Sequence, residues 1–342
     1  MKILQVIDIL NIGGAERVFV DMCNILKENN EDISALILLE NSGELSKGIH
    51  GGIPIITLNR KNKWNILTMY KCSKTLRKYD IIHCHFRHVY RYIILVKKLF
   101  FVDSKIVLHD HFGSIDIDKK IPFLFDSFIK PNYYIGVSNT LSKWAEKSLK
   151  TAPENIFLLE NIIVRNNSKQ LFSNTFDLIL VSNIKKVKNN IFAVKIAQEN
   201  NNSLLLVGKN QDNTYFSELK SEIRNTDIVI NSDVAEVQPI LHNAKLGLHT
   251  SISETGPLVL IEYLAQGIPF LAYETGETAR ILKPYFPEYF IDNFEEQQWI
   301  ERINKLLKIQ PETKKMQEVF DKYFGAEQYY KKIMKIYQCI ND

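Results

Sequence analysis

The chain has 342 residues, a length that fits two domains of ordinary size. Its composition, 45% hydrophobic and 24% charged, is typical of a globular protein and excludes an extensively disordered one. The net charge of +4 lacks the strong basic bias of nucleic-acid-binding proteins, so no nucleic-acid partner is expected. No apolar run reaches the length of about 18 residues that predicts a transmembrane helix.

The cysteines and residues 1–10 indicate in which cellular compartment the protein is expected. Cys23, Cys72, Cys84 and Cys339 are scattered without metal-ligand spacing, so we expect free or buried thiols. Residues 1–10 contain an aspartate and no small-residue cleavage site, which favours a first core strand over a signal peptide. These features predict a cytoplasmic protein.

Strands and amphipathic helices alternate through the first half of the sequence. Apolar strand patterns lie at residues 2–10, 33–40, 54–59, 80–86, 105–112, 133–138 and 155–161, and helix patterns at 13–30, 64–79 and 139–150. Apolar strands alternating with helices predict a parallel sheet covered on both faces.

A polar stretch without periodicity, residues 161–175, is the predicted linker. The alternation then restarts, with strands at 176–183, 203–208, 227–232, 246–251 and 270–274 and helices at 191–200, 215–224, 237–244, 295–309, 314–324 and 326–340. The sequence therefore predicts an α/β protein of two doubly wound domains with a helical tail. Ligands of such sheets bind beyond the carboxyl ends of the strands, here in the cleft between the domains.

Residues 253–269 (SETGPLVLIEYLAQGIP) carry the most informative pattern, which reads as loop, helix and turn. Thr255 and Gly256 are cap-type residues, and Pro257 suits the first helical turn, where a missing N–H costs nothing. Gly267 stands where a left-handed residue ends a helix.

The start of this helix suits a phosphate, because free N–H groups and the helix dipole create partial positive charge there. Glu254 precedes the helix and Glu262 lies on its second turn, so two carboxylates flank the phosphate position. Carboxylates accept hydrogen bonds from vicinal hydroxyls of a ribose or hexose, and the combination indicates a sugar nucleotide. An ordinary amphipathic helix with a surface glutamate at each end is the alternative.

The stretch resembles the paired-glutamate motif of retaining GT-B glycosyltransferases, in particular glycosyltransferase family 4. The resemblance implies a Rossmann-like acceptor domain at 1–165, a Rossmann-like donor domain at 166–324 and a C-terminal helix at 325–342 that packs back on the first domain. It implies metal-independent, retaining transfer of a hexose-type sugar from a UDP or GDP donor to a glycan or lipid-linked hydroxyl acceptor, without a cofactor. Bacterial surface polysaccharide or glycoconjugate synthesis is the implied setting.

The resemblance also assigns roles to residues. Glu254 and His109 are the catalytic candidates that orient the donor sugar, Glu262 contacts the ribose, and the backbone of Val234 meets the base. Lys188 and the amides at the start of the helix would hold the leaving diphosphate. The donor-binding candidates are Gly14, Asn183, Lys188, Val234, Thr255, Gly256, Pro257, Leu258, Val259 and Glu262.

A glycine-rich loop, residues 11–18 (NIGGAERV), follows the first strand. Gly13 and Gly14 allow close backbone approach to an anion at a helix start, although a plain strand-to-helix turn is the alternative. The loop resembles the Gly-Gly-Ala-Glu loop of the same family, which faces the donor phosphates or the acceptor. Gly13, His85 and His111 are the acceptor-side candidates.

A lysine-rich loop, residues 181–190, follows the first strand of the second domain, and a solvated charge run is its ordinary meaning. The family normally carries an arginine here and a lysine five residues on. Lys188 matches the lysine, but Asn183 stands at the arginine position and removes a bidentate cation. Either Lys185 or Lys186 compensates, or the donor site is weaker. This departure keeps open a non-catalytic sugar-nucleotide-binding protein, and a sugar-nucleotide epimerase of the same fold is the other alternative.

Histidines gather at the ends of two predicted strands. His83 and His85 share one face of residues 80–86, and His109 and His111 flank Asp110. The group raises the hypothesis of a zinc site. Histidines at loop ends in a sugar-binding cleft explain the pattern without a metal, so no metal site is predicted.

Two further patterns are assigned to structure rather than to chemistry. Asp116 and Asp118 have the spacing of the metal-binding aspartates of the other glycosyltransferase fold, but they lie in a polar segment and are expected at the surface. Residues 90–102 mix basic and aromatic side chains. An amphipathic core helix with basic ends is the preferred interpretation, and a peripheral contact with the inner face of a membrane is the alternative.

Overall fold

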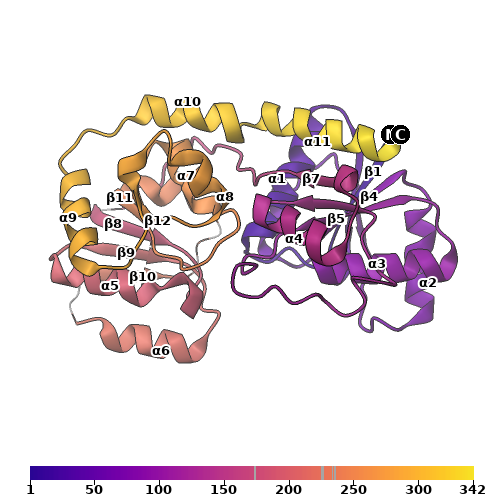
Figure 1. The fold of residues 1–342 in the computed structure, drawn as a ribbon, viewed down its shortest axis with the longest axis horizontal. Helices are drawn as coiled ribbons and strands as arrows, with labels where there is room; N and C mark the ends of the chain where they lie inside the picture. Colours follow the sequence, from indigo (N-terminus) through magenta and orange to yellow (C-terminus); the bar gives the residue numbers. More distant parts are fainter. Residues whose placement is uncertain (173–174, 225–226, 233, 235) are drawn as a thin grey trace. The chain divides into compact units, whose positions relative to one another are not determined.

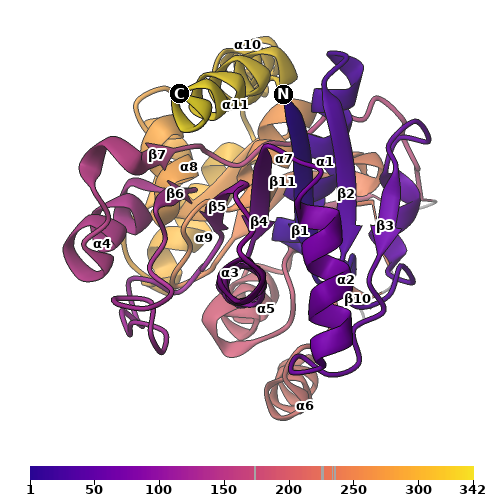
Figure 2. The ribbon, with the colours of Figure 1, turned by 90° about the vertical axis from the view of Figure 1, so that its right-hand side faces the viewer.

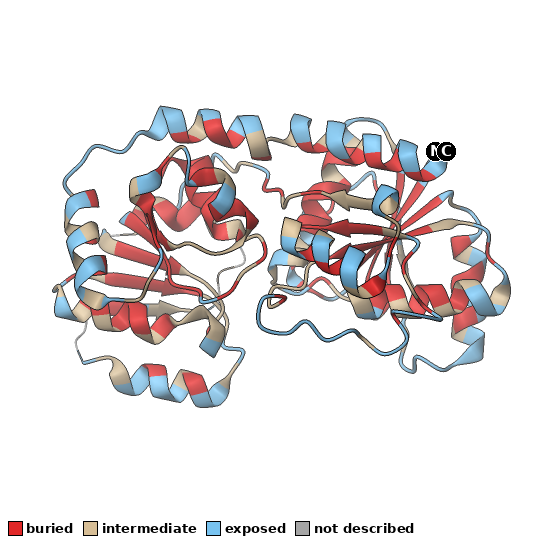
Figure 3. Ribbon diagram, in the orientation of Figure 1, coloured by how far each residue is buried: buried red, intermediate tan, exposed pale blue. Residues whose placement is uncertain are grey.

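The computed structural model describes residues 1–172, 175–224, 227–232, 234 and 236–342 (Figure 1). The contacts divide the chain into two compact units. The first contains Met1–Ile163 together with Gly325–Asp342, and the second contains Val164–Phe324. The strands of both units are mostly buried, as expected for parallel sheets with helices on both faces (Figure 3).

The first unit is built on a parallel sheet of seven strands, in the order β3-β2-β1-β4-β5-β6-β7. Because β1 lies between β2 and β4, the direction in which strands are added reverses beside β1 (Figure 2). The strands are β1 (Lys2–Ile7), β2 (Asp32–Ile37), β3 (Ile55–Thr57), β4 (Ile81–His85), β5 (Lys105–Asp110), β6 (Tyr133–Gly136) and β7 (Ile156–Leu158).

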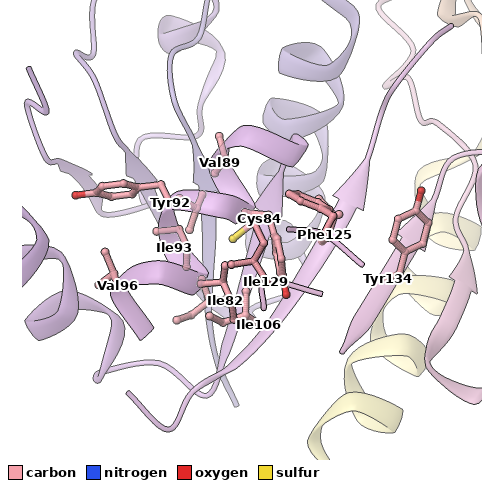
Figure 4. Packing of buried hydrophobic residues seen from close by; sticks show 14 of the residues in the cluster. Ile82, Cys84, Val89, Tyr92, Ile93, Val96, Ile106, Phe125, Ile129 and Tyr134 are labelled. Carbon is pink, nitrogen blue, oxygen red and sulfur yellow. The ribbon is translucent and has the colours of Figure 1, made fainter. Parts of the chain in front are cut away.

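Helices cover this first sheet through apolar faces. They are α1 (Gly14–Glu28), α2 (Ile66–Leu76), α3 (Arg87–Phe100), α4 (Asn139–Leu149) and α11 (Ala326–Asn341), with short 3₁₀ turns at Glu44–Gly48 and Pro153–Asn155. Val89, Ile93 and Val96 of α3 pack with Ile82 and Cys84 of β4 in the core (Figure 4). The preferred interpretation of residues 90–102 as an amphipathic core helix therefore agrees with the packing of α3.

Helix α11 follows the second unit in the chain but belongs to the first. Its buried residues are Tyr329, Ile333, Ile336, Tyr337 and Ile340, which repeat at helical spacing. Tyr330 Oη donates a hydrogen bond to Glu31 (2.7 Å), and Lys332 forms an ion pair with Glu160 (2.8 Å). Both the apolar and the polar faces of α11 therefore have partners within the first unit.

The second unit has a six-stranded parallel sheet in the order β10-β9-β8-β11-β12-β13. Its strands are β8 (Phe176–Val181), β9 (Leu204–Val207), β10 (Ile228–Asn231), β11 (Ala244–His249), β12 (Phe270–Tyr273) and β13 (Phe290–Ile291). Its helices are α5 (Asn190–Glu199), α6 (Asn213–Glu222), α7 (Leu258–Gln266), α8 (Gly276–Leu282), α9 (Glu296–Leu306) and α10 (Thr313–Phe324), with 3₁₀ turns η3 (Lys186–Lys188), Gln238–Asn243 and Pro287–Tyr289. Two doubly wound sheets confirm the predicted α/β class.

Helix α7 is fixed to this sheet by Tyr263. A Cβ atom at Gly247 of β11 would lie 2.6 Å from the Tyr263 ring, so only glycine allows the ring to pack there. The Tyr263 hydroxyl lies 3.1 Å from the carbonyl oxygen of Ile179 and 3.2 Å from that of Leu248. Because β8 and β11 both hold this side chain, the start of α7 has a set position beside their carboxyl ends.

Candidate functional site

The second unit has a candidate site where its strand order reverses. Strands β8 and β11 are neighbours, and the chain leaves β8 toward β9 before it returns to β11. Lys188 follows β8 in η3, and Glu254 follows β11. Because parallel strands present their carboxyl ends at one edge, both residues lie at the type of position where doubly wound sheets bind ligands.

Hydrogen bonds hold the two loops together. The Thr250 hydroxyl donates to the carbonyl oxygen of Lys188 (3.0 Å), and the Ile252 N–H donates to that of Val187 (2.9 Å). The Glu254 N–H donates to Thr275 Oγ1 (3.2 Å). Hydrogen bonds therefore join the loop that carries Glu254 to the segments on both sides of it.

Gly276 allows a further close approach to this loop. Its φ is +83°, and a Cβ atom there would lie 2.9 Å from Pro257 Cδ and 3.1 Å from the carbonyl oxygens of Glu254 and Thr255. The next residue, Glu277, donates its N–H to the Thr255 carbonyl (2.7 Å). The segment that carries Glu254 is therefore packed against the start of α8.

Glu254 contacts the basic side chains of the site. Its carboxylate forms an ion pair with the Lys188 ammonium, and its Oε1 lies 3.5 Å from His249 Nε2. Burial alone would raise the pKa of Glu254, but the positive charge of Lys188 and the proximity of His249 outweigh it and hold the pKa far below its usual range. The carboxylate is therefore ionised, and its partner cation lies beside it.

The start of α7 differs in detail from the prediction. Pro257 is the N-cap, and the helix begins at Leu258, because a ψ of 115° keeps Pro257 extended. The helix ends at Gly267 with the predicted left-handed backbone (φ +67°). Thr255, Val259 and Glu262 are buried, whereas Gly256 and Leu258 are half-buried. The Ser253 hydroxyl is buried without a hydrogen-bond partner among the described residues.

The lysines of the lysine-rich loop differ in their exposure to solvent. Asn183 and Lys185 are half-buried, and Lys186 is exposed. Burial, and then the charge of Lys188, lower the pKa of Lys185, while the Glu254 carboxylate opposes them. Lys185, one of the two residues proposed to replace the arginine, is therefore within electrostatic reach of the Lys188–Glu254 pair. Val234 is half-buried after β10, between two positions outside the described residues.

The glycine-rich loop of the first unit contains an acid that the sequence analysis did not single out. Gly13 is the N-cap of α1 and Gly14 its first residue. A Cβ atom at Gly13 would lie 2.3 Å from Glu16 Oε2, so the Glu16 carboxyl lies over the loop. Burial, with a contribution from the nearby Asp8 carboxylate, raises the pKa of Glu16 to about 7. A glutamate three residues after a helix cap was the signal available in the sequence.

Three of the predicted histidines lie in strands of the first sheet, and the fourth follows the end of a strand. His83 and His85 belong to β4 and His109 to β5, and all three are fully buried, whereas His111, just after β5, is half-buried. Burial lowers the pKa of each ring, that of His111 to about 4, so the rings are neutral near pH 7. The structure brings His85, His109 and His111 together, with ring centroids 4.1–5.3 Å apart.

The two aspartates with metal-site spacing lie at the surface, as predicted. Asp116 and Asp118 are exposed. Asp118 Oδ1 accepts a hydrogen bond from the Lys120 N–H (3.0 Å), which is an ordinary turn contact.

Comparison with known protein families gives one match. Residues 165–323 match the family described as Glycosyl transferases group 1. A search of curated proteins finds no match for the sequence.

Solved structures resemble the whole chain. Alr3699/HepE from Anabaena, solved in complex with UDP and glucose, has a TM-score of 0.80 and 17% identity over 99% of both chains. A glycosyltransferase from Rickettsia africae has a TM-score of 0.75 and 18% identity over 99% of this chain and 98% of its own. A TarM mutant from S. aureus has a TM-score of 0.76 and 11% identity over 98% of this chain and 100% of its own. With the two doubly wound sheets, these similarities show the predicted GT-B fold.

We expect Glu254→Gln to destabilise the protein in a pH-dependent way. Because the folded-state pKa of Glu254 is depressed, its ion pair stabilises the folded state fully above the unfolded pKa of about 4.3, and the stabilisation is lost as pH falls. At pH 7 the free energy of unfolding, measured with urea, should be about 1.5–3 kcal/mol lower for the variant than for the wild type. This difference should shrink below about pH 4.3.

Glu274→Gln is the matched control, because the ion pair of Glu274 with Lys283 is partly exposed to solvent and should contribute less. A Glu254→Gln variant as stable as the control at pH 7 would show that the buried pair adds no stability.

Proposed function

We propose that this protein is a glycosyltransferase that moves a hexose-type sugar from a nucleoside diphosphate to a hydroxyl acceptor, with retention of configuration and without a metal. The observation that carries the proposal is the Lys188–Glu254 pair at the strand-order reversal of a domain that matches Glycosyl transferases group 1. A diphosphate needs positive charge, and a hexose needs hydrogen-bond acceptors. The pair supplies both within one hydrogen-bonded loop.

The ion pair also suggests how donor binding works. The Lys188 ammonium is now partnered by Glu254, and an incoming diphosphate would share that ammonium. Glu254 would then accept a bond from a donor-sugar hydroxyl, and the N–H groups at the start of α7 would face the phosphate. Glu262, on the second turn of α7, is proposed to bind the ribose.

A uridine donor and a surface-glycan acceptor are proposed from the relatives. HepE was solved with UDP-glucose, and the TarM mutant with UDP and α-GlcNAc-glycerol. WaaB, another structural relative, is described as a lipopolysaccharide outer core galactosyltransferase. We infer a UDP-hexose donor and an acceptor of the surface-glycan class for this chain. A site in the cytoplasm, at the inner face of the membrane, follows from the same proposal.

Calorimetric titration with UDP, GDP and their hexose conjugates tests donor binding. UDP and UDP-glucose should bind, and Glu262→Ala should weaken both by about 1.5–3 kcal/mol because a charged hydrogen bond to the ribose is lost. Glu218→Ala, which removes an exposed carboxylate of α6 in the same unit, is the control and should bind normally. Binding of none of the nucleotides would contradict the proposed function, and unchanged binding by Glu262→Ala would contradict the ribose contact.

Turnover should not require a metal. Release of UDP from UDP-glucose should proceed at the same rate with and without EDTA, because Lys188 and the start of α7 offset the charge that a metal would otherwise neutralise. A rate abolished by EDTA and restored by Mg²⁺ or Mn²⁺ would overturn the metal-independent mechanism.

A membrane surface is proposed as the location of a lipid-linked acceptor. No helix in the described part of the chain is both long and apolar enough to span a bilayer. Apolar side chains are nevertheless exposed near the packed helices α2 and α3: Trp64 is 66%, Leu67 69% and Phe101 86% exposed. Lysines accompany them, with Lys74 Nζ 4.6 Å from the centre of the Tyr70 ring. Apolar and basic groups together suit an anionic bilayer surface.

Co-sedimentation with phosphatidylglycerol vesicles tests this contact. Trp64→Ser combined with Phe101→Ser should reduce the bound fraction, since each change removes exposed apolar surface. Leu171→Ser is the control, because Leu171 is 70% exposed in the second unit. Equal binding by the double variant and the control would locate any membrane contact elsewhere.

A further inference from the structure

His249 is the last residue of β11 and lies beside the Lys188–Glu254 pair. Its side chain is only 2% exposed, and its Nε2 lies 3.5 Å from Glu254 Oε1. Neither ring nitrogen has a hydrogen-bond partner among the described residues. Because a neutral imidazole carries one donor and one acceptor, its burial without partners has a cost. His249 therefore has hydrogen-bonding capacity to spare beside a buried carboxylate.

The three side chains belong to the second unit, and hydrogen bonds hold their loops together. The hydroxyl of Thr250, the residue after His249, lies 3.0 Å from the carbonyl oxygen of Lys188 and 3.2 Å from that of Asn189. The Lys188 side chain is 18% exposed and that of Glu254 13%. An anion that arrives from solvent can therefore reach the ammonium, whereas the imidazole stays covered.

The ion pair with Lys188 is what an arriving diphosphate would disturb. Burial raises the pKa of Glu254, and the charge of Lys188 is the largest of the contributions that lower it. A diphosphate brings about two negative charges and would share the same ammonium. Glu254 would then be a buried carboxylate beside an anion, with less positive charge to balance it. Such a carboxylate either takes up a proton or needs another cation.

The imidazole is a better acceptor for that proton than the carboxylate. In model compounds the pKa of an imidazole is about 6.5 and that of a glutamic acid about 4.3. A protonated ring carries an N–H on both nitrogens, so one of them necessarily faces Glu254 Oε1. The two side chains would then form a charge-assisted hydrogen bond in place of the ion pair with Lys188.

We propose that His249 is a positioning residue that takes up a proton when a diphosphate engages Lys188, and that it then replaces Lys188 as the partner of Glu254. The exchange keeps the Glu254 carboxylate ionised and free to accept a hydrogen bond from the donor sugar. The diphosphate and the sugar rest on the proposed function, whereas the exchange rests on the contacts of the three side chains. Donor binding is thereby coupled to proton uptake, so the affinity for the donor rises as the pH falls.

Charged groups on the neighbouring elements decide when the ring gains its proton. These groups are Lys185 and Lys188 after β8, Glu262 on α7, Glu274 after β12 with its partner Lys283, and Glu277 on α8 with its partner Arg280. The two lysines after β8 oppose a further positive charge beside Glu254. The proton therefore enters when the negative charge of a diphosphate offsets these lysines.

Nitrogen-15 NMR of histidine-labelled full chain tests the exchange without a ligand. Lys188→Met removes the ammonium and leaves Glu254 to His249, whose signals are assigned by their loss in His249→Gln. At pH 7 the ratio of charged to neutral His249 should rise about tenfold over the wild type, because one nearby positive charge is lost. Lys186→Met is the matched control, since Lys186 is an exposed lysine of the same loop, and it should change the ratio little.

Calorimetric titration with UDP-glucose, in two buffers of different ionisation enthalpy, counts the protons that binding takes up. UDP-glucose is the probe because both of its phosphates are esterified and neither titrates near pH 7. The wild type should take up about one proton for each UDP-glucose bound. His249→Gln keeps an N–H donor but no titrating ring, and should take up none. His242→Gln is the control, because His242 is half-buried in the same unit but contacts Gln266 (3.2 Å), and it should take up protons as the wild type does.

Binding of UDP-glucose without proton uptake overturns the proposal. Uptake that persists in His249→Gln also overturns it, because the proton then enters Glu254 or another group. The absence of any binding of UDP-glucose would contradict the proposed function instead. In that case the NMR comparison still decides the exchange of partners, since an unchanged ratio in Lys188→Met overturns it and a raised ratio supports it.

Discussion

The parallel arrangement of the strands is the constraint on which the candidate site depends. Parallel strands end at the same edge of a sheet, and at a reversal of strand order the chain continues in opposite directions from two neighbouring strands. In the second unit those loops follow β8 and β11, and they carry Lys188 and Glu254. The Tyr263 side chain holds α7 to the same two strands, so the ion pair and the helix start are fixed by one framework.

The negative charge of Glu254 is balanced by basic side chains close to it. Glu254 has Lys188 and His249 as partners, and Lys185 adds positive charge from a half-buried position. Asn183 contributes no charge where an arginine is usual in the family that the sequence resembles. A diphosphate bound as proposed would meet point charges from lysines and no guanidinium at position 183, so its orientation would depend more on backbone N–H groups.

The sequence predicted the parts of this structure that local patterns determine. Apolar strands alternating with amphipathic helices predicted the doubly wound fold class. Gly267 predicted the end of α7, because a left-handed residue is needed there. The pairing of Lys188 with Glu254 was not predictable, since it joins residues 66 positions apart through a tertiary contact. Pro257 was placed one position too far into the helix, because proline suits either side of a helix start.

The burial of the histidines shows a second limit of sequence patterns. Alternation along β4 correctly put His83 and His85 on one face, but it does not reveal what covers that face. The cover includes Tyr337, which is 254 residues away from His83 in the chain. Polar residues near the strand ends were therefore interpreted as loop-end groups, whereas long-range contacts such as that of Tyr337 with His83 hold them inside the core.

The chain passes from the first unit to the second after Ile163 and returns after Phe324, so the second unit is an insertion within the first. A ribosome completes the inserted unit before it makes α11. Until then Gln5 and His83 are without the Tyr337 hydroxyl, and the apolar face that α11 covers is open. Synthesis of the first unit thus begins before that of the second unit and ends after it. The incomplete first unit must avoid aggregation while the 161 residues of the second unit are synthesised.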